Sequence, residues 1–254
     1  MASVLPRPAV SAWSNVNNVT LGQVVVEAKS NEITAIPKLL EMLEIAGCFV
    51  TIDAMGCQTE IAEKIVDGQG HYCLAVKENQ PTLYHGILDH VVDHMEDDFV
   101  RTQATVHETF EQGHGREEHR SYYVLPVPKD LPDAARWKKL AAIGVAINHT
   151  VRDGKETGAV RLYILSKKVS ALKFGTAVRS HWGIENRLHW QLDVNFNEDQ
   201  CRVRKNKGDV NLSLARRTAL TLLKHEKTAK CGVKNRRLLA ALDVEYLQKV
   251  LFGK

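Results

Sequence analysis

Residues 48–80 read CFVTIDAMGCQTEIAEKIVDGQGHYCLAVKENQ, and this stretch decides the class of fold. Its first apolar run, CFVTI, is short and rich in β-branched residues, which predicts a central strand buried on both faces. A helical pattern follows over Gln58–Val66, ends near two glycines, and leads into a second buried run at Tyr72–Val76. Strand, helix and strand in this order predict a layered α/β domain.

The same alternation continues on both sides of this stretch. Ala9–Asn15 and Gln23–Ala28 are predicted to be two strands joined as a hairpin. Asn31 is a capping residue for a helix expected over Glu32–Ala46. On the other side, Pro81–Met95 has the pattern of a helix that begins at its proline. The first part of the chain therefore predicts strands and helices of one α/β layer system.

Between Val100 and Leu165 the pattern changes to alternating residues, which is typical of antiparallel strands. Four strands are expected there, over Thr102–Phe110, Arg120–Leu125, Leu140–His149 and Gly158–Leu165. This predicts an antiparallel β region inserted into the α/β scaffold. Beyond it, helices are expected over Ser170–Val178, Arg179–Asp193, Asp209–His225 and Asn235–Leu251.

The stretch 179–199, RSHWGIENRLHWQLDVNFNED, combines helix signals with His, Trp and carboxylate side chains. One face of the helix, spaced i, i+4 and i+8, would carry Glu185, His189 and Asp193, with Trp182 one turn earlier. A parallel apolar row consists of Ile184, Leu188 and Leu192. Such a helix can dock on a core and hold its polar row at the rim of a cleft. The alternative is that the carboxylates are solvated charges and the Trp pair is core.

Asp53 directly follows the first buried run, at the end of a strand where ligands of open α/β sheets bind. The alternative is that Asp53 only caps the following turn. If the β region folds out and the later helix returns across the sheet, Asp53 and Glu185 could meet. Carboxylate oxygens held together suit magnesium rather than zinc, and paired ions would assist attack on a phosphodiester.

The net charge of +4 hides an asymmetry along the chain. Residues 201–254 hold 14 Lys and Arg against 4 Asp and Glu, a net charge of +10, and residues 1–200 have a net charge of −6. Clustered cations of this kind suit a polyanion, most commonly nucleic acid, although a ribosome-like or membrane-surface contact would look similar. No long apolar run and no basic-then-apolar N-terminus appears, so the sequence predicts a cytoplasmic protein without a membrane span.

Other candidate sites have weaker support. His90 and His94 are spaced i, i+4 like a metal pair, but no third ligand or H-E-x-x-H pattern accompanies them. The five cysteines are odd in number and form no C-x-x-C pair, which predicts reduced thiols. Cys57 lies near Asp53, yet nothing marks a partnering His, so a buried thiol is expected there instead of a nucleophile.

Four segments resemble the DDE transposases of bacterial insertion sequences, in the branch that includes the H-repeat-associated proteins. They are NEITAIPKLLEMLEIAGCFVTIDAMGCQTEIAEKI, AVKENQPTL, GHGREEHRSYYV and RSHWGIENRLHWQLDVNFNEDQCRVRK. The resemblance runs from about Val10 to Leu251, and the IDAMGCQ and HWGIEN blocks are specific. It implies an RNase H-like α/β fold in which three acidic residues bind two divalent ions, normally magnesium.

Asp53 in TIDAMG matches the family's second Asp, and Glu185 in HWGIEN matches its Glu. The family's first Asp lies in a D-G-K segment on the preceding strand, whereas this chain has no Asp before Asp53. The resemblance therefore implies an N-terminally truncated chain that is defective in catalysis. The wider group places a Tyr and an Arg where this chain has Val178 and His181, a variation of this branch, and a neutral imidazole attracts phosphate less than a guanidinium does.

The resemblance also implies roles and partners. Asp53 and Glu185 would hold Mg²⁺ or Mn²⁺. The residues expected to position DNA or the acidic shell are Arg179, His181, Asn186 and His189. The residues expected to bind phosphates are Arg202, Arg204, Lys205 and Lys207. The partners would be DNA, as transposon ends and target, and further copies of the chain, because transposases generally work in assemblies.

The expected organisation has three parts. Residues 1–99 would form the first part of an RNase H-like core without its first strand, residues 100–168 the β insertion, and residues 169–254 the catalytic helix and a basic helical tail. Three functions stay open at this point: an active transposase, a non-catalytic DNA-binding remnant or regulator of transposition, and an unrelated cytoplasmic enzyme with a basic tail.

Overall fold

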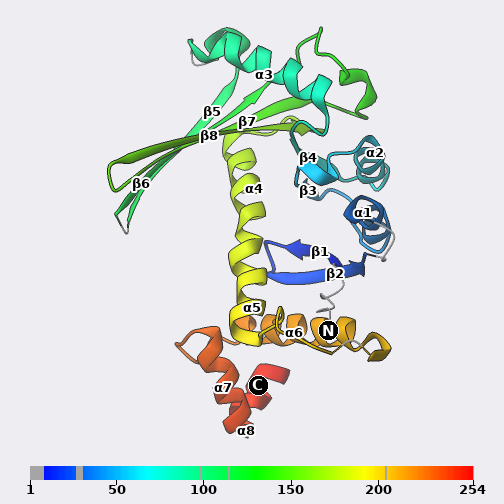
Figure 1. The fold of residues 1–254 in the computed structure, drawn as a ribbon, viewed down its shortest axis with the longest axis vertical. Coiled ribbons are helices and arrows are strands. Elements are labelled where there is room, and N and C mark those ends of the chain that lie inside the picture. Colours follow the sequence, from blue (N-terminus) through cyan, green and yellow to red (C-terminus); the bar gives the residue numbers. More distant parts are fainter. Residues whose placement is uncertain (1–8, 27–30, 98, 114, 204, 254) are drawn as a thin grey trace, which may run out of the picture. The chain divides into compact units, whose positions relative to one another are not determined.

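The computed structural model describes residues 9–26, 31–97, 99–113, 115–203 and 205–253 (Figure 1). It divides into two compact units, one of residues 44–181 and the other of residues 1–43 together with 182–254. The division into residues 1–99, 100–168 and 169–254, which the sequence predicts, stays a prediction.

The unit of residues 44–181 contains a six-stranded mixed sheet with the order β3-β4-β8-β7-β6-β5. Its strands are β3 (Phe49–Ile52), β4 (His71–Val76), β5 (Thr105–Gly113), β6 (Arg116–Leu125), β7 (Ala142–Arg152) and β8 (Lys155–Leu165). β3 and β4 pair in parallel, and the other neighbours are antiparallel. The mixed α/β class is thus confirmed, and the expected β region continues the same sheet through the β4–β8 pairing.

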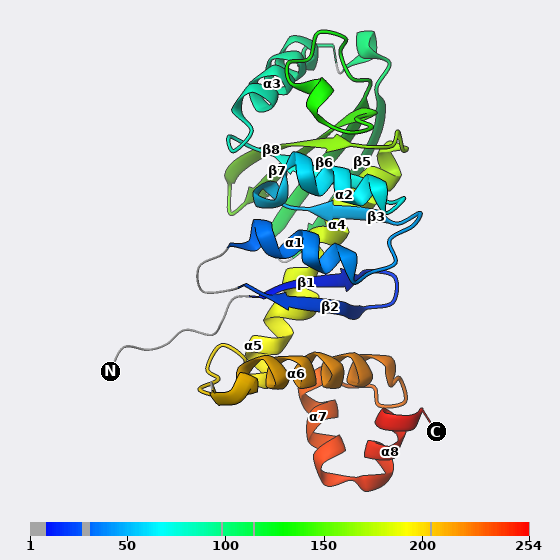
Figure 2. The same cartoon turned by 90° about the vertical axis from the view of Figure 1, so that its right-hand side faces the viewer.

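Helices cover both faces of this sheet. They are α2 (Thr59–Asp67), α3 (Pro81–Met95) and the first part of α4 (Ala171–Ile184). The sheet lies between α3 and the start of α4, as two perpendicular views show (Figure 1, Figure 2). Phe174 of α4 is fully buried, with its ring centroid 5.3 Å from that of Tyr163 and 6.2 Å from that of Tyr122. Gly144 on β7 makes room for this ring, because an added Cβ would lie 2.5 Å from it.

The other unit contains a hairpin and the C-terminal helices. Its elements are β1 (Ala9–Ser14), β2 (Val19–Val25), α1 (Glu32–Glu41), the π-helical segment η4 (Glu185–His189), α5 (Trp190–Phe196), α6 (Gly208–His225), α7 (Val233–Leu242) and α8 (Val244–Phe252). Leu188, Leu192 and Leu220 form a buried cluster against which Ile184 packs. The apolar row predicted for this helix therefore docks on a core, as expected.

Several expectations about individual elements were wrong. β3 is an edge strand of its sheet and is half-buried, whereas the sequence predicted burial on both faces. Trp182 and Trp190 are 47% and 52% exposed, so the alternative that the Trp pair is core is wrong. The single C-terminal helix is two helices, because Asp243 caps α8 by accepting hydrogen bonds from the backbone N–H groups of Glu245 and Tyr246.

Within the part of the chain that the structure describes, no helix has the length and apolar character that spanning a bilayer requires.

Candidate nucleic-acid site

Asp53 stands where β3 ends. Its backbone is extended, and it caps the short helix Ala54–Gly56. A carboxylate oxygen of Asp53 accepts a hydrogen bond from the backbone N–H of Gly56 at 3.4 Å, and the side chain is exposed. The capping role weighed from the sequence is confirmed. It is compatible with ligand binding, since one long hydrogen bond leaves most carboxylate lone pairs available.

The loop after β4 holds the Asp53 turn in place. Because β3 and β4 are parallel, their C-terminal ends meet at the same edge of the sheet. Asn79 donates from Nδ2 to the carbonyl oxygen of Ala54 at 2.7 Å, and Gln80 donates from Nε2 to that of Cys57 at 2.9 Å. Sequence reasoning missed these two residues. Their signal was the polar KENQ run directly after a buried strand.

His181 brings α4 to the same strand. Its Nδ1 lies 3.1 Å from Oγ1 of Thr51, two residues before Asp53. Side chains two residues apart on an extended strand point to the same face. Near the other end of β3, Nζ of Lys173 lies 5.9 Å from the ring centroid of Phe49. The stretch of α4 from Lys173 to His181 therefore follows β3 towards Asp53.

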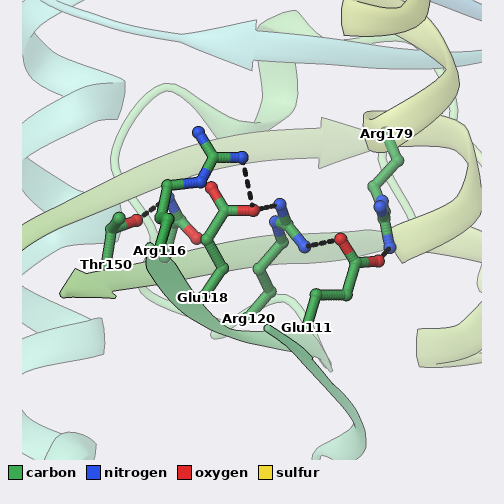
Figure 3. Close-up of polar contacts among 7 residues, drawn as sticks. Glu111, Arg116, Glu118, Arg120, Thr150 and Arg179 are labelled. Carbon is green, nitrogen blue, oxygen red and sulfur yellow. Dashed lines mark hydrogen bonds and ion pairs between the residues drawn. The ribbon is translucent and has the colours of Figure 1, made fainter. Parts of the chain in front are cut away.

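Arg179 is engaged by an acidic side chain of the β5–β6 hairpin. Its Nη1 lies 2.6 Å from Oε1 of Glu111, and Nη1 of Arg120 lies 3.0 Å from Oε2 of the same carboxylate. Arg120 also pairs with Glu118, which Arg116 contacts at 3.1 Å (Figure 3). The hydrogen bonds from Arg179 and then Arg120 hold the pKa of Glu111 below its usual value. This predicted DNA-binding arginine thus has an internal anionic partner.

Glu185 begins the π-helical segment Glu185–His189. A π-turn is wider than an α-turn, and the i, i+4 row predicted for Glu185, His189 and Asp193 stays a prediction. The side chain of Glu185 lies outside the described residues, and Asp53 and Glu185 belong to different units. Their convergence stays a prediction. Single π-turns within helices occur frequently at functional sites.

The other predicted positions on this helix differ in exposure. Asn186 is exposed. His189 is half-buried and lines a cavity of about 180 Å³ together with Glu198, Asp209 and Arg217. Nη1 of Arg217 is 3.2 Å from both carboxylate oxygens of Glu198. His189 therefore faces a cavity that already contains an internal ion pair.

The basic tail divides into exposed and internally used cations. Arg202, Lys205 and Lys207 are exposed, as phosphate binding would require, and Arg204 lies outside the described residues. Four other cationic side chains donate hydrogen bonds to oxygen atoms within the fold: Arg217, Lys224, Arg236 and Arg237. Burial, and after it the charge of Arg187, lowers the pKa of Lys224, whose Nζ lies 5.3 Å from the ring centroid of Trp13. The net charge of the tail is therefore larger than the positive charge that is exposed for binding a polyanion.

The residues around Asp53 fit a hard cation only in part. The exposed carboxylate of Asp53 suits one oxygen ligand of an ion such as Mg²⁺. The described residues contain no group of three or more His, Cys, Asp and Glu side chains that could hold an ion. His90 and His94 contact each other, with ring centroids 4.8 Å apart, and lack such a third ligand. Burial raises the pKa of the Cys57 thiol to about 12, which agrees with the expected inert, buried thiol.

Comparison with known proteins identifies the class. Residues 9–222 match the family described as the transposase DDE domain, and the chain belongs to this family. The chain is 40% identical over 254 residues to the "H repeat-associated putative transposase YhhI" of Escherichia coli K12. This alignment covers 96% of the chain and 65% of that protein. The chain is also 42% identical over 246 residues to the "Putative transposase YncI" of Escherichia coli O157:H7. That alignment covers 95% of the chain and 62% of that protein. The resemblance seen in the sequence is confirmed, and the chain spans less than two thirds of the length of these relatives.

Proposed function

We propose that the protein acts on DNA as a metal-dependent transposase, with Asp53 and Glu185 as acidic ligands of a divalent cation. The observation that carries this proposal is the contact between His181 and Thr51 at 3.1 Å. It attaches α4 to the strand that ends at Asp53, and His181 is four residues before Glu185 in the sequence. Membership of the transposase DDE domain family supports the same interpretation.

The chain's own residues have distinct proposed roles. Asp53 and Glu185 would hold Mg²⁺ or Mn²⁺, which when bound activates an attacking oxygen and stabilises the leaving oxygen of a phosphodiester. Asn79 and Gln80 keep the Asp53 turn in its position through their hydrogen bonds. The exposed cations Arg202, Lys205 and Lys207, and Arg204 with them, would bind DNA phosphates. Arg179, His181, Asn186 and His189 would position the DNA or the acidic residues.

The 254 residues contain no Asp before Asp53. We therefore propose that a polypeptide of these residues binds DNA and cleaves it weakly or not at all. The loss of one ligand from a paired-metal site loosens the ions and misplaces the nucleophile. The second candidate function, a non-catalytic DNA-binding regulator of transposition, is favoured by the exposed cations of the tail.

The test uses the purified chain and a duplex that carries the DNA flanking its gene. With Mg²⁺ we expect salt-sensitive binding and at most weak cleavage, which Asp53→Asn abolishes. Asp153→Asn, an exposed carboxylate 81% accessible on the β7–β8 turn, is the matched control. Robust cleavage would contradict the proposed defect. Binding that stays constant between low and moderate salt would contradict the proposed phosphate contacts.

A further inference from the structure

A cluster of lysines surrounds His71 at the N-terminal end of β4. Asp53 lies beyond the C-terminal end of the parallel strand β3, so the two sites are at opposite ends of these strands. His71 is the first residue of β4 and the register partner of Phe49, the first residue of β3. Nζ of Lys167 lies 3.4 Å from Nε2 of His71, and Lys173 lies over the Phe49 ring. We call His71, Lys139, Lys167 and Lys173 the His71 patch.

The topology explains why these lysines meet. β8 is antiparallel to β4, and Cys73 pairs with Leu165, so the chain leaves β8 beside the start of β4. Ser166 fixes this exit, because its hydroxyl accepts a hydrogen bond from the backbone N–H of Tyr72 at 2.8 Å. β7 begins at the same edge, where Ala142 pairs with Leu165. Lys139 precedes β7, Lys167 follows β8, and Lys173 belongs to the first turn of α4.

The His71 patch is positive in a unit that is otherwise acidic. Residues 44–181 hold 16 Lys and Arg against 19 Asp and Glu, a net charge of −3. Lys139, Lys167 and Lys173 are exposed, and none forms an ion pair with a described carboxylate. Neighbouring Lys138, in contrast, pairs with Glu63 at 3.1 Å and Asp67 at 2.6 Å. Burial, and after it the charges of Lys167, Lys139 and Lys173, lowers the pKa of His71.

We propose that the His71 patch is a second DNA-binding surface that contacts the phosphate backbone of a duplex. This inference rests on the proposed function, since the family acts on DNA. Exposed ammonium groups without carboxylate partners can each replace a counterion on the backbone, and they carry no sequence preference. The four residues of β3, at about 3.3 Å per residue, place roughly 13 Å of strand between this patch and Asp53. The His71 patch is therefore separate from the proposed cation site.

The test compares two triple variants of the full chain with equal loss of charge. Lys139→Asn, Lys167→Gln and Lys173→Gln remove the patch, and Asn is chosen at position 139 because that backbone is left-handed, with φ 56°. Lys129→Gln, Arg152→Gln and Lys155→Gln, exposed positions of the same unit, form the control. Affinity for a mixed-sequence duplex is measured by fluorescence anisotropy across a salt series, with thermal melting as a check of folding.

The patch variant should bind about tenfold more weakly at low salt, and its slope of log affinity against log salt should fall by about 0.9 for each phosphate that the lysines no longer neutralise. The control variant should match the wild type. In NMR titrations the pKa of His71 should rise when the wild type binds the duplex, because phosphates neutralise the lysines.

The outcomes separate this inference from the proposed function. If the wild type binds no duplex at all, the proposed function fails and the inference fails with it. If the wild type binds and the patch variant keeps the affinity and slope of the control, only the inference is overturned. Binding of polyglutamate through the patch, without binding of the duplex, would assign the surface to an acidic protein partner and would also overturn it.

Discussion

His181 lies 3.1 Å, Nδ1 to Oγ1, from Thr51, although the two residues belong to segments far apart in the chain. This contact ties the C-terminal half of α4 to the strand that presents Asp53. The imidazole helps to position the helix that continues into Glu185.

Thr51→Val should remove this hydrogen bond while it keeps the shape of the side chain. We expect the free energy of unfolding to fall by about 1 kcal/mol, the usual net contribution of such a bond. Thr51→Ser, which keeps the hydroxyl, is the control. Urea denaturation measures both variants, and equal stability of Val and Ser at this position would show that the contact contributes nothing.

Gly144→Ala should disturb the seat of α4 on the sheet. The new Cβ would lie 2.5 Å from the Phe174 ring and 3.0 Å from Cδ1 of Leu165. Both side chains are fully buried, so neither can retreat, and we expect a loss of about 1–3 kcal/mol in stability. Gly158→Ala on β8, where an added Cβ meets nothing within 4 Å, should change stability by less than about 0.5 kcal/mol. Similar thermal stability of both variants would contradict this packing.

Local signals explain what the sequence predicted well. The side chain of Asn31 accepts a hydrogen bond from the backbone N–H of Thr34 at 3.3 Å, and α3 begins at Pro81, both as expected. Asp243 carries an equally local capping signal, which was overlooked within an apolar helical pattern. Such signals involve residues within one helical turn, so a single sequence contains them.

Tertiary relationships explain what could not be predicted. The apolar run of β3 resembles a central strand, and only the strand order shows that it stands at an edge. The pairing of Arg179 with Glu111 joins a helix to a distant hairpin, so no local pattern announces it. Leu188 and Leu192 stay in one buried cluster despite the π-turn that begins at Glu185. The spacing of apolar residues in the sequence therefore gives no sign of this turn.

Glu111→Gln should free Arg179 for phosphate. Both side chains are partly exposed, so we expect stability to change by less than about 1 kcal/mol. If Arg179 binds DNA as proposed, duplex affinity should increase and the salt slope should steepen by about 0.9. Glu156→Gln, an exposed acid paired with His149, gives the same change in net charge. Identical binding by the two variants would remove Arg179 from the DNA interface.

Glu226→Gln should flatten the acid dependence of stability. Hydrogen bonds from Thr228, and further bonds from Tyr246 and Ala229, lower the pKa of this buried carboxyl to about 2. A lowered pKa stabilises the fold above the unfolded value of about 4.3, and this stabilisation is lost as the pH falls towards 2. Denaturant titrations between pH 5 and pH 2 measure the effect. A variant as acid-sensitive as the wild type would contradict the assignment.

A divalent cation shared by Asp53 and Glu185 is the centre of the proposed mechanism, and Mn²⁺ titration followed by electron paramagnetic resonance tests it most directly. The wild type and the surface control Asp153→Asn should bind Mn²⁺ alike. Asp53→Asn and Glu185→Gln should each weaken binding by about tenfold or more, which corresponds to about 1.4 kcal/mol. Equal Mn²⁺ affinity in all four proteins would contradict the shared site.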